Sequence, residues 1–328
     1  MKRVAIILLA LTVSTALCAL EVEEGNVRLT LDEDSSRFLL DIRSSGGRDD
    51  WVPLIFPEDP RTSGLDIREG NRIFRIGDGG EFRQVAEVTD EGVFFVWTSA
   101  TLRVSERFRF IRSVGGDVVD GVQIDITVTN LGEQAVPVGM RLLLDTYLGE
   151  RGNAHFATPL RQQITREAEI QSSAVEWYIR STPADGGAGL QVMLTGSGVT
   201  TPDQVAVANW KRLSDSDWVY TINENRNFNR LPYSINDSAL LLSYGERVLL
   251  QNERYEVSVQ MGGLADNGFL DPDSSAPVTN DSRLALMDGL TNLLEQIDAL
   301  LADPNATVQD VANLRDQLQA LSQQVPGL

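Results

Sequence analysis

Two acidic residues, Asp145 and Glu150, flank a short polar segment that follows a strongly apolar run at 138–144. Enzymes that cleave glycans need only two carboxyl groups held several ångströms apart, so this pair could do acid–base chemistry on a sugar. With 47 acidic residues in the chain, such pairs also arise by coincidence, and Asp145 can equally bond backbone amides of its own loop. We favour that structural role for Asp145 and keep both residues as candidate ligand-binding groups.

A second group of candidates combines aromatic rings with amide and guanidinium groups between residues 209 and 244. Such combinations are used to recognise sugars and peptides. The members are Trp210, Trp218, Tyr220, Phe228, Tyr233, Asn223, Asn225, Asn227, Asn229, Arg226 and Arg230. We favour the simpler interpretation, in which Trp210 and Trp218 fill the core and the asparagines satisfy a long loop. Any saccharide affinity should still depend on residues 209–233, above all on Trp218 and Arg226.

The chain has a single histidine, His155, and a single cysteine, Cys18. A Ser-His-Asp device needs a correctly placed histidine, and a catalytic zinc site generally needs two or three. We expect His155 to be structural or on the surface, and we expect neither a cofactor nor a metal site. The acidic stretches at 32–34 and 271–273 could hold calcium, but neither fits the helix–loop–helix pattern. These observations favour a protein that is not an enzyme.

Residues 1–19 have the features of a secretory signal peptide. Lys2 and Arg3 precede an apolar run at 4–13 that is short for a membrane span, and small residues follow it. Leu17 does not suit a lipidation signal at Cys18, so we expect cleavage without lipid attachment. The mature chain would be periplasmic or secreted in a bacterium, with no transmembrane segment and no internal disulfide.

Charge excludes some partners. The chain has 28 basic and 47 acidic residues and a net charge of −19. Phosphates would be repelled by such a protein, so neither nucleic acid nor anionic lipid is expected as a main partner. A saccharide remains compatible with this charge.

The segment at 20–263 repeats short apolar runs separated by turn residues, a pattern typical of an antiparallel β-sandwich. Residues Val122, Ile124, Ile126 and Val128 alternate with polar residues and predict a strand with one buried face. A second apolar run after Pro137 predicts that the two strands form a hairpin.

The stretches LLLDTYLGERGNAHF and VAVANWKRL resemble a poorly characterised group of bacterial exported β-sandwich domains. The resemblance implies either an immunoglobulin-like fold or the larger supersandwich shared with aldose mutarotases, and it implies no settled activity. Related loops after LLLDT contain an aspartate–glycine pair, whereas this chain reads RGNA at 151–154. The difference weakens the transfer of an acidic ligand site.

After a linker at 264–282, the apolar period changes from two to about three and a half, which predicts a helical hairpin at 283–328. The first helix adds Leu286, Leu293 and Leu300 beside its apolar seam, so its stripe is wider than one partner helix can cover. We expect these leucines to contact the sandwich, a second copy of the chain or another envelope protein.

The sequence therefore favours an exported structural or adaptor protein of the bacterial envelope that binds a protein partner through its C-terminal hairpin. The alternative is a periplasmic protein that binds or cleaves glycans with acidic and aromatic loop residues.

Overall fold

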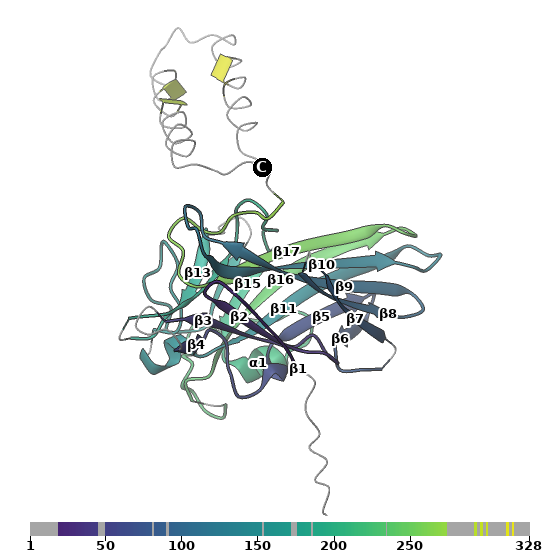
Figure 1. The fold of residues 1–328 in the computed structure, drawn as a ribbon, viewed down its shortest axis with the longest axis horizontal. Helices are drawn as coiled ribbons and strands as arrows, with labels where there is room; N and C mark the ends of the chain where they lie inside the picture. Colours follow the sequence, from purple (N-terminus) through teal and green to yellow (C-terminus); the bar gives the residue numbers. More distant parts are fainter. Residues whose placement is uncertain are drawn as a thin grey trace, which may run out of the picture.

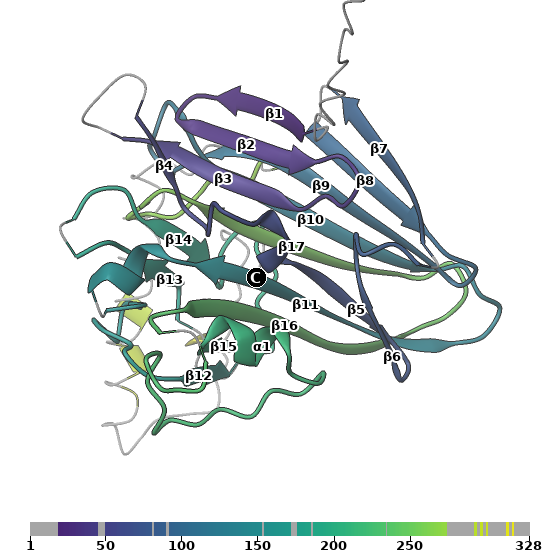
Figure 2. The same ribbon diagram turned by 90° about the horizontal axis from the view of Figure 1, so that it is seen from below.

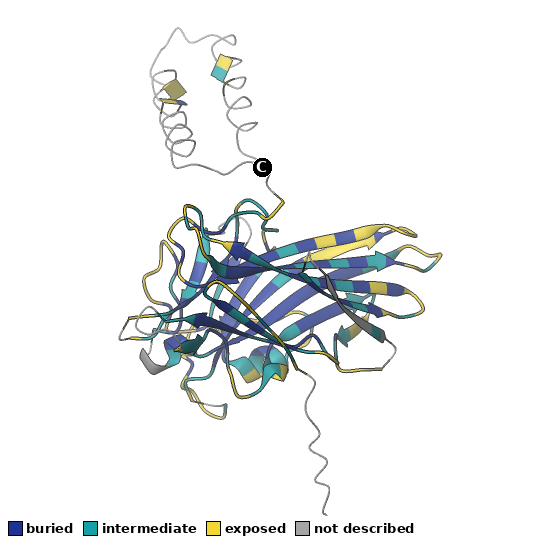
Figure 3. Ribbon diagram, in the orientation of Figure 1, coloured by how far each residue is buried: buried dark blue, intermediate teal, exposed yellow. Residues whose placement is uncertain are grey.

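The computed structural model describes residues 19–44, 50–80, 82–89, 92–152, 154–171, 176–184, 186–233 and 235–273, and single residues between 292 and 317. The described strands form three antiparallel sheets, of which the two larger ones pack face to face (Figure 1). One apolar core between the sheets collects buried side chains from all three (Figure 3). The mainly β, antiparallel sandwich predicted from the sequence is confirmed.

The seven-stranded sheet contains the strand with the clear period of two. Val122, Ile124, Ile126 and Val128 are each at most 1% exposed, so this alternation correctly predicted the buried face. The strand order is β13 (Tyr178–Ser181), β14 (Leu190–Met193), β17 (Arg254–Gly262), β10 (Val119–Asn130), β9 (Leu102–Arg112), β8 (Gly92–Thr98) and β7 (Arg83–Thr89).

The six-stranded sheet carries the candidate site. Its central strand β11 is apolar on both faces because Leu142 and Leu144 enter the main core, whereas Leu143 enters a second cluster on the outer face. The order is β12 (Ala168–Gln171), β15 (Gln204–Ala208), β16 (Ser238–Leu249), β11 (Val136–Thr146), β5 (Gly64–Glu69) and β6 (Arg72–Arg75). The short helix α1 (Trp210–Ser214) covers this second cluster, since its Leu213 is a member.

The predicted hairpin between the two apolar runs is wrong. β10 pairs with β9 and β17, whereas β11 pairs with β16 and β5 in the other sheet. The short connection between them crosses from one sheet to the other. Side chains of both strands join the same core, and burying their apolar faces there gains more than pairing the two backbones edge to edge would.

A third, four-stranded sheet lies alongside β9 and β10 (Figure 2). Its inward residues Val27, Leu29 and Leu31 are at most 1% exposed and join the same core. The strands are β1 (Ala19–Glu24), β2 (Val27–Asp32), β3 (Phe38–Arg43) and β4 (Trp51–Pro53). The chain then passes through the 3₁₀ turn η1 (Pro60–Thr62) before entering β5.

Both chain ends fall largely outside the described residues. The predicted signal peptide and Cys18 lie there, as do Leu286 and most of the predicted helical hairpin, so these stay predictions. The described residues of the tail have helical backbone, and Leu293 is 5% exposed. The side chain of Gln317 donates to Gln296 Oε1 at 3.3 Å. No helix in the described part of the chain is long and apolar enough to cross a membrane.

Candidate functional site

The end of β11 holds two carboxyl groups close together. Asp145, the penultimate residue of the strand, is 5% exposed, and Glu150 is half-buried in the 3₁₀ turn η2 (Leu148–Gly152). We call Asp145 and Glu150 the carboxyl pair. Among the described residues that influence them electrostatically, the charged ones are all acidic: Asp59 and Asp237 act on Asp145, and Asp237 also acts on Glu150.

The proton affinity of the carboxyl pair is unusual. Burial raises the pKa of Asp145 to about 7, against a stabilising hydrogen bond from Thr62, and the neighbouring carboxylates raise it further. Burial likewise raises the pKa of Glu150 to about 8, with Asp237 and Asp145 adding to the effect. Because the two groups interact, they titrate as a pair. Around neutral pH the pair therefore carries at least one proton in a large fraction of molecules.

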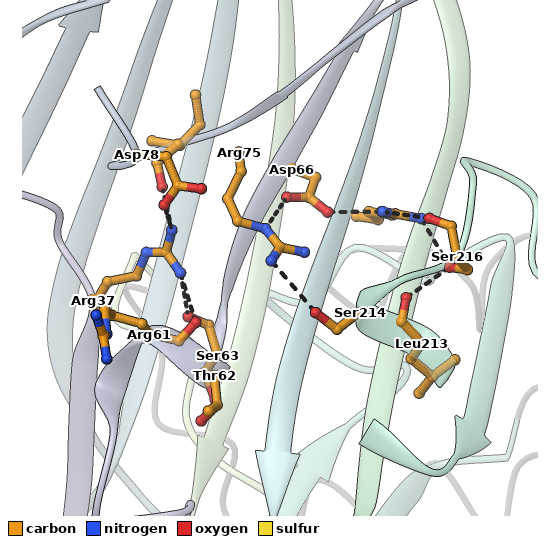
Figure 4. A network of polar contacts seen from close by, with 12 residues as sticks. Arg37, Arg61, Thr62, Ser63, Asp66, Arg75, Asp78, Leu213, Ser214 and Ser216 are labelled. Atoms are coloured by element: carbon orange, nitrogen blue, oxygen red, sulfur yellow. Dashed lines mark hydrogen bonds and ion pairs between the residues drawn. The ribbon is translucent and has the colours of Figure 1, made fainter. Parts of the chain in front are cut away.

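The segment after β4 holds Asp145 in place. The backbone N–H of Asp145 donates to Ser63 Oγ at 2.9 Å, and its carbonyl accepts from the N–H of Phe56 at 2.9 Å. Arg37 fixes this segment because its guanidinium donates to the carbonyls of Arg61 and Ser63 at 3.0 and 3.2 Å (Figure 4). The buried arginine thus supports Asp145 through the backbone rather than by neutralising it.

Glu150 is held from the other side, by the start of β16. Glu150 Oε1 accepts from the backbone N–H of Ser238 at 2.8 Å and from its hydroxyl at 3.3 Å. The preceding residue, Asp237, receives a bond to its carbonyl from Asn209 Nδ2 at 3.0 Å. Trp210, next to Asn209, donates from its indole to the carbonyl of Thr62 at 2.7 Å. This bond attaches the half-buried Trp210 to the segment that also holds Asp145 in place.

The other aromatic candidates lie elsewhere. Trp218 is half-buried on the outer face of the six-stranded sheet, where its ring lies 5.3 Å from the guanidinium of Arg141 and 5.9 Å from that of Arg68. It covers Gly139 so closely that a Cβ there would lie 2.8 Å from the ring. The simpler interpretation of the sequence expected Trp210 and Trp218 to fill the core. Neither of them lies between the two large sheets.

Asp66 organises the surroundings of Trp218. It accepts from Arg75 at 3.0 Å and from Arg141 at 2.9 Å, in a row that crosses β6, β5 and β11 (Figure 4). Arg141 also donates to the carbonyl of Asp217 at 2.9 Å. These bonds anchor the chain that follows α1. We therefore interpret this row of charged side chains as structural.

Arg226 and Tyr233 belong to a third place, around Glu167. The Glu167 carboxylate lies 2.7 Å from Arg212 and 3.5 Å from Arg226, and it accepts from the hydroxyl of Tyr220 at 3.1 Å. The guanidinium of Arg226 lies 4.8 Å from the Tyr233 ring centre. We call these five residues the Glu167 cluster. The structure thus divides these candidates among three places, apart from Phe228, which lies in the main core beside His155. Only Trp210 adjoins the carboxyl pair.

His155 is buried rather than on the surface. It is 2% exposed and its ring lies 4.1 Å from that of Phe228. Burial lowers the pKa of His155 to about 4, so the imidazole is neutral. Its Nδ1 has no hydrogen-bond partner within the described part of the protein.

A raised pKa alone does not mark a site. Burial also raises the pKa of Glu106 to about 7, but this residue lies on β9 in the core, where the hydroxyl of Ser36 donates to it at 2.5 Å. The distinguishing feature at β11 is a second, half-buried carboxyl group beside the first.

The described residues include no group of three or more His, Cys, Asp or Glu side chains that could hold a metal ion. The two proposed calcium stretches have other bonds. Asp32 accepts from the backbone of Asp34 and the hydroxyl of Ser35, and Asp273 forms an ion pair with Arg109.

Sequence reasoning named Asp145, Glu150 and Trp210 but missed their neighbours. Asp237, Ser238 and Thr62 reach the carboxyl pair through the pairing of β11 with β16 and β5. Nothing in the local sequence marks them, because each lies far from Asp145 along the chain.

Comparison with known proteins finds likenesses among solved structures alone. No protein-family model matches the chain, and no curated protein does. Among solved structures, a galactose mutarotase-like protein from Lactobacillus casei is 8% identical, with 75% of this chain and 100% of that one covered and a TM-score of 0.48. A galactose mutarotase-related enzyme from Lactobacillus acidophilus is 9% identical, with 77% and 100% covered and a TM-score of 0.40.

An α-N-acetylgalactosaminidase from Bifidobacterium bifidum is 13% identical, with 75% of this chain and 36% of that one covered and a TM-score of 0.42. The neighbours thus include mutarotase-like β-sandwich proteins and glycoside-active ones. At such low identities and TM-scores, the likeness says nothing about what this chain binds.

Proposed function

We propose that the protein binds a neutral saccharide at the carboxyl pair and that Asp145 and Glu150 exchange protons with it. The observation that carries this proposal is a buried and a half-buried carboxyl group at one strand end, with Asp145 acting electrostatically on Glu150 and no described cation named among the groups that act on either. A protein gains no stability from such an arrangement, because desolvation and mutual repulsion both oppose ionisation. Strongly perturbed carboxyl groups of this kind are typical of functional sites.

The chemistry that suits the pair is general acid–base catalysis at a sugar oxygen. At neutral pH one carboxyl group of the pair can hold a proton to donate while the other accepts one. The raised pKa values of about 7 and about 8 fit this division. Glu150 is the more exposed member, so it is the group that would contact the ligand, with Asp145 behind it.

The ligand class follows from charge and from Trp210. The net charge of −19 and the neighbouring Asp59 and Asp237 disfavour an anionic ligand. A neutral polyhydroxylated molecule can bond to the carboxyl groups in either protonation state. The indole of Trp210 would supply an aromatic surface, which sugar rings commonly pack against.

A glycan array tests the proposal directly. The wild-type protein should bind neutral glycans in preference to sialylated or uronic-acid glycans. Glu150→Gln and Trp210→Ala should each weaken binding at least tenfold, because one loses the ionisable contact and the other the aromatic surface. Glu256→Gln, at an exposed side chain on β17, is the matched control and should bind normally. The absence of any bound glycan, or a preference for anionic ones, would contradict the proposal.

The adaptor hypothesis, with a protein partner at 283–328, stays a prediction, as does export. It depends on Leu286, Leu293 and Leu300, of which Leu286 lies outside the described residues. Affinity capture from intact envelopes, with and without this segment, is the measurement that would decide it.

A further inference from the structure

The side chain of Arg37 joins three parts of the fold. Arg37 directly precedes β3 and is only 3% exposed. Its Nη1 donates to the carbonyls of Arg61 and Ser63, at the turn η1 and just after it. Its Nη2 donates to the carbonyl of Ile76 at 3.1 Å and to the carboxylate of Asp78 at 2.6 Å, in the chain after β6 (Figure 4). One planar guanidinium therefore connects the turn between β2 and β3 with η1 and with the end of β6.

Thr62 lies between the two carbonyls that Nη1 of Arg37 holds, and it contacts two groups of the proposed site. Its own carbonyl accepts from the indole of Trp210 at 2.7 Å, and its side chain forms a hydrogen bond with the carboxyl group of Asp145. The next residue, Ser63, accepts from the backbone N–H of Asp145 at 2.9 Å. This short segment therefore sets where the aromatic surface lies relative to the carboxyl pair.

The backbone of Arg37 is itself held by the core. The preceding residue, Ser36, has a φ of 54°, and its hydroxyl donates to the buried Glu106 on β9 at 2.5 Å. The carbonyl of Arg37 accepts from the N–H of Asp32 at 2.8 Å. A Cβ on Gly64 would lie 2.9 Å from Nη1, so the guanidinium packs directly against the start of β5. Both ends of the arginine side chain are therefore fixed.

Stability of the fold alone does not account for a buried guanidinium at this place. Burial lowers the pKa of Arg37, because the charged form loses its hydration. An apolar side chain of similar size would fill the space at lower cost, but it could hold neither carbonyl. Arg37 is also not named among the described groups that act electrostatically on the carboxyl pair, so its influence runs through the backbone. We propose that Arg37 is a positioning residue that aligns Trp210 with Asp145 through the turn η1, an inference that rests on the proposed function.

NMR of the free protein tests this role. Arg37→Lys keeps the charge, but an ammonium group lacks the planar fork that holds two neighbouring carbonyls. The indole N–H of Trp210 should then exchange with solvent roughly tenfold faster or more, because its acceptor is no longer fixed. The carbon-13 titration midpoint of Asp145 should move by about half a pH unit or more, because its partners shift. The indole of Trp97, which is 2% exposed on β8, should keep the wild-type exchange rate.

A second variant and a matched control accompany Arg37→Lys. Gly64→Ala places a methyl group against Nη1 and so displaces the guanidinium without removing it. It should change the same two signals by a smaller amount, and it serves if Arg37→Lys does not fold. Arg28→Lys makes the same exchange at an arginine of β2 that donates to Asp41 instead, at 3.2 Å. It should leave both signals as in the wild type.

Two results would overturn the positioning role. One is wild-type exchange at Trp210 together with a wild-type titration of Asp145 in both Arg37→Lys and Gly64→Ala. The other is an equal acceleration at Trp97, because Arg37 would then support the whole sandwich rather than the site. Neither signal needs a bound ligand, so a glycan array that finds no binder would refute the proposed function separately from this inference.

Discussion

Glu167 and Asp145 are both buried acidic residues beside the six-stranded sheet, at 2% and 5% exposure, but their surroundings are opposite. Glu167 faces two arginines and accepts from a tyrosine hydroxyl and from the backbone N–H of Asn223. Asp145 faces other carboxyl groups and has hydroxyl and backbone partners but no described cation.

The difference separates two uses of a buried carboxyl group. At the Glu167 cluster two guanidinium groups face one carboxylate, which ties the loop at 209–233 to the sheet. At the carboxyl pair nothing balances a negative charge, so protons stay on the pair to a higher pH than on ordinary acids. A proton held near neutral pH can be transferred, whereas a carboxylate locked between arginines cannot readily take part in such chemistry.

The largest effect is expected at the Glu167 cluster. Glu167→Gln leaves Arg212 and Arg226 without their counter-charge, and breaking a buried ion pair in this way should lower the free energy of unfolding by roughly 3 to 5 kcal/mol. Urea denaturation at pH 7 measures this change. Glu256→Gln, at an exposed glutamate, should change it by less than about 0.5 kcal/mol. A loss below about 1 kcal/mol at Glu167 would mean that the cluster does not anchor the loop.

A smaller change in the free energy of unfolding, and an increase rather than a decrease, is expected when Asp145 is replaced. The unfolded chain releases this proton near pH 4, whereas the folded protein keeps it up to about pH 7. The contribution of this group to stability is therefore full below about pH 4 and is lost as the pH rises through 7. Asp145→Asn cannot ionise, so at pH 9 it should be more stable than the wild type by roughly 2 to 4 kcal/mol.

Urea denaturation at two pH values checks the sign. At pH 4.5 the advantage of Asp145→Asn should shrink to about 1 kcal/mol or less, because the folded wild type keeps its proton and the unfolded chain is only about half a pH unit above its own pKa. Asp217→Asn, at an exposed side chain, should show no such pH dependence. An Asp145→Asn variant that is destabilised at pH 9 would show that the carboxylate is favourably bound after all.

The smallest effect concerns Glu150. Ser238→Ala removes the hydroxyl that donates to Glu150 Oε1 but keeps the backbone donor. The ionised form loses one bond, so the pKa of Glu150 should rise by a further half to one unit, roughly. Carbon-13 NMR titration of the glutamate side chains measures it. Ser258→Ala, which removes a hydroxyl bound to Asp125 instead, should leave the Glu150 titration unchanged.

The features that the sequence predicted correctly are those that depend only on residues close together in the chain. The alternation from Val122 to Val128 identified a strand and its buried face because period two is a local property. The partner of that strand was predicted wrongly, because an apolar face states only that something must cover it. Side chains of the other two sheets cover it in the common core, and the edges of β10 are occupied by β9 and β17.

The same limit applies to the site. Asp145 and Glu150 were paired because they are five positions apart at a strand end, whereas Asp237 joins them only through the register that sets Asp145 opposite Ala239. The aromatic residues from Trp210 to Tyr233 looked like one group in the sequence. The helix α1 and the irregular chain after it carry them to different partners, which composition alone does not reveal.

The position of β17 constrains how this protein can acquire its fold. It is the last strand in the described part of the chain, yet it lies inside the seven-stranded sheet, between β14 and β10. Its register with β10 runs from Gly121 opposite Gly262 to Thr129 opposite Arg254, which joins parts of the chain far apart in sequence. Contacts of this kind slow folding, because a long loop must close before they form. Until residue 262 is free to pair, β10 has an open edge that can associate with other chains. The sandwich must therefore form late and cooperatively, and a chain that stops before β17 lacks a central strand of its largest sheet.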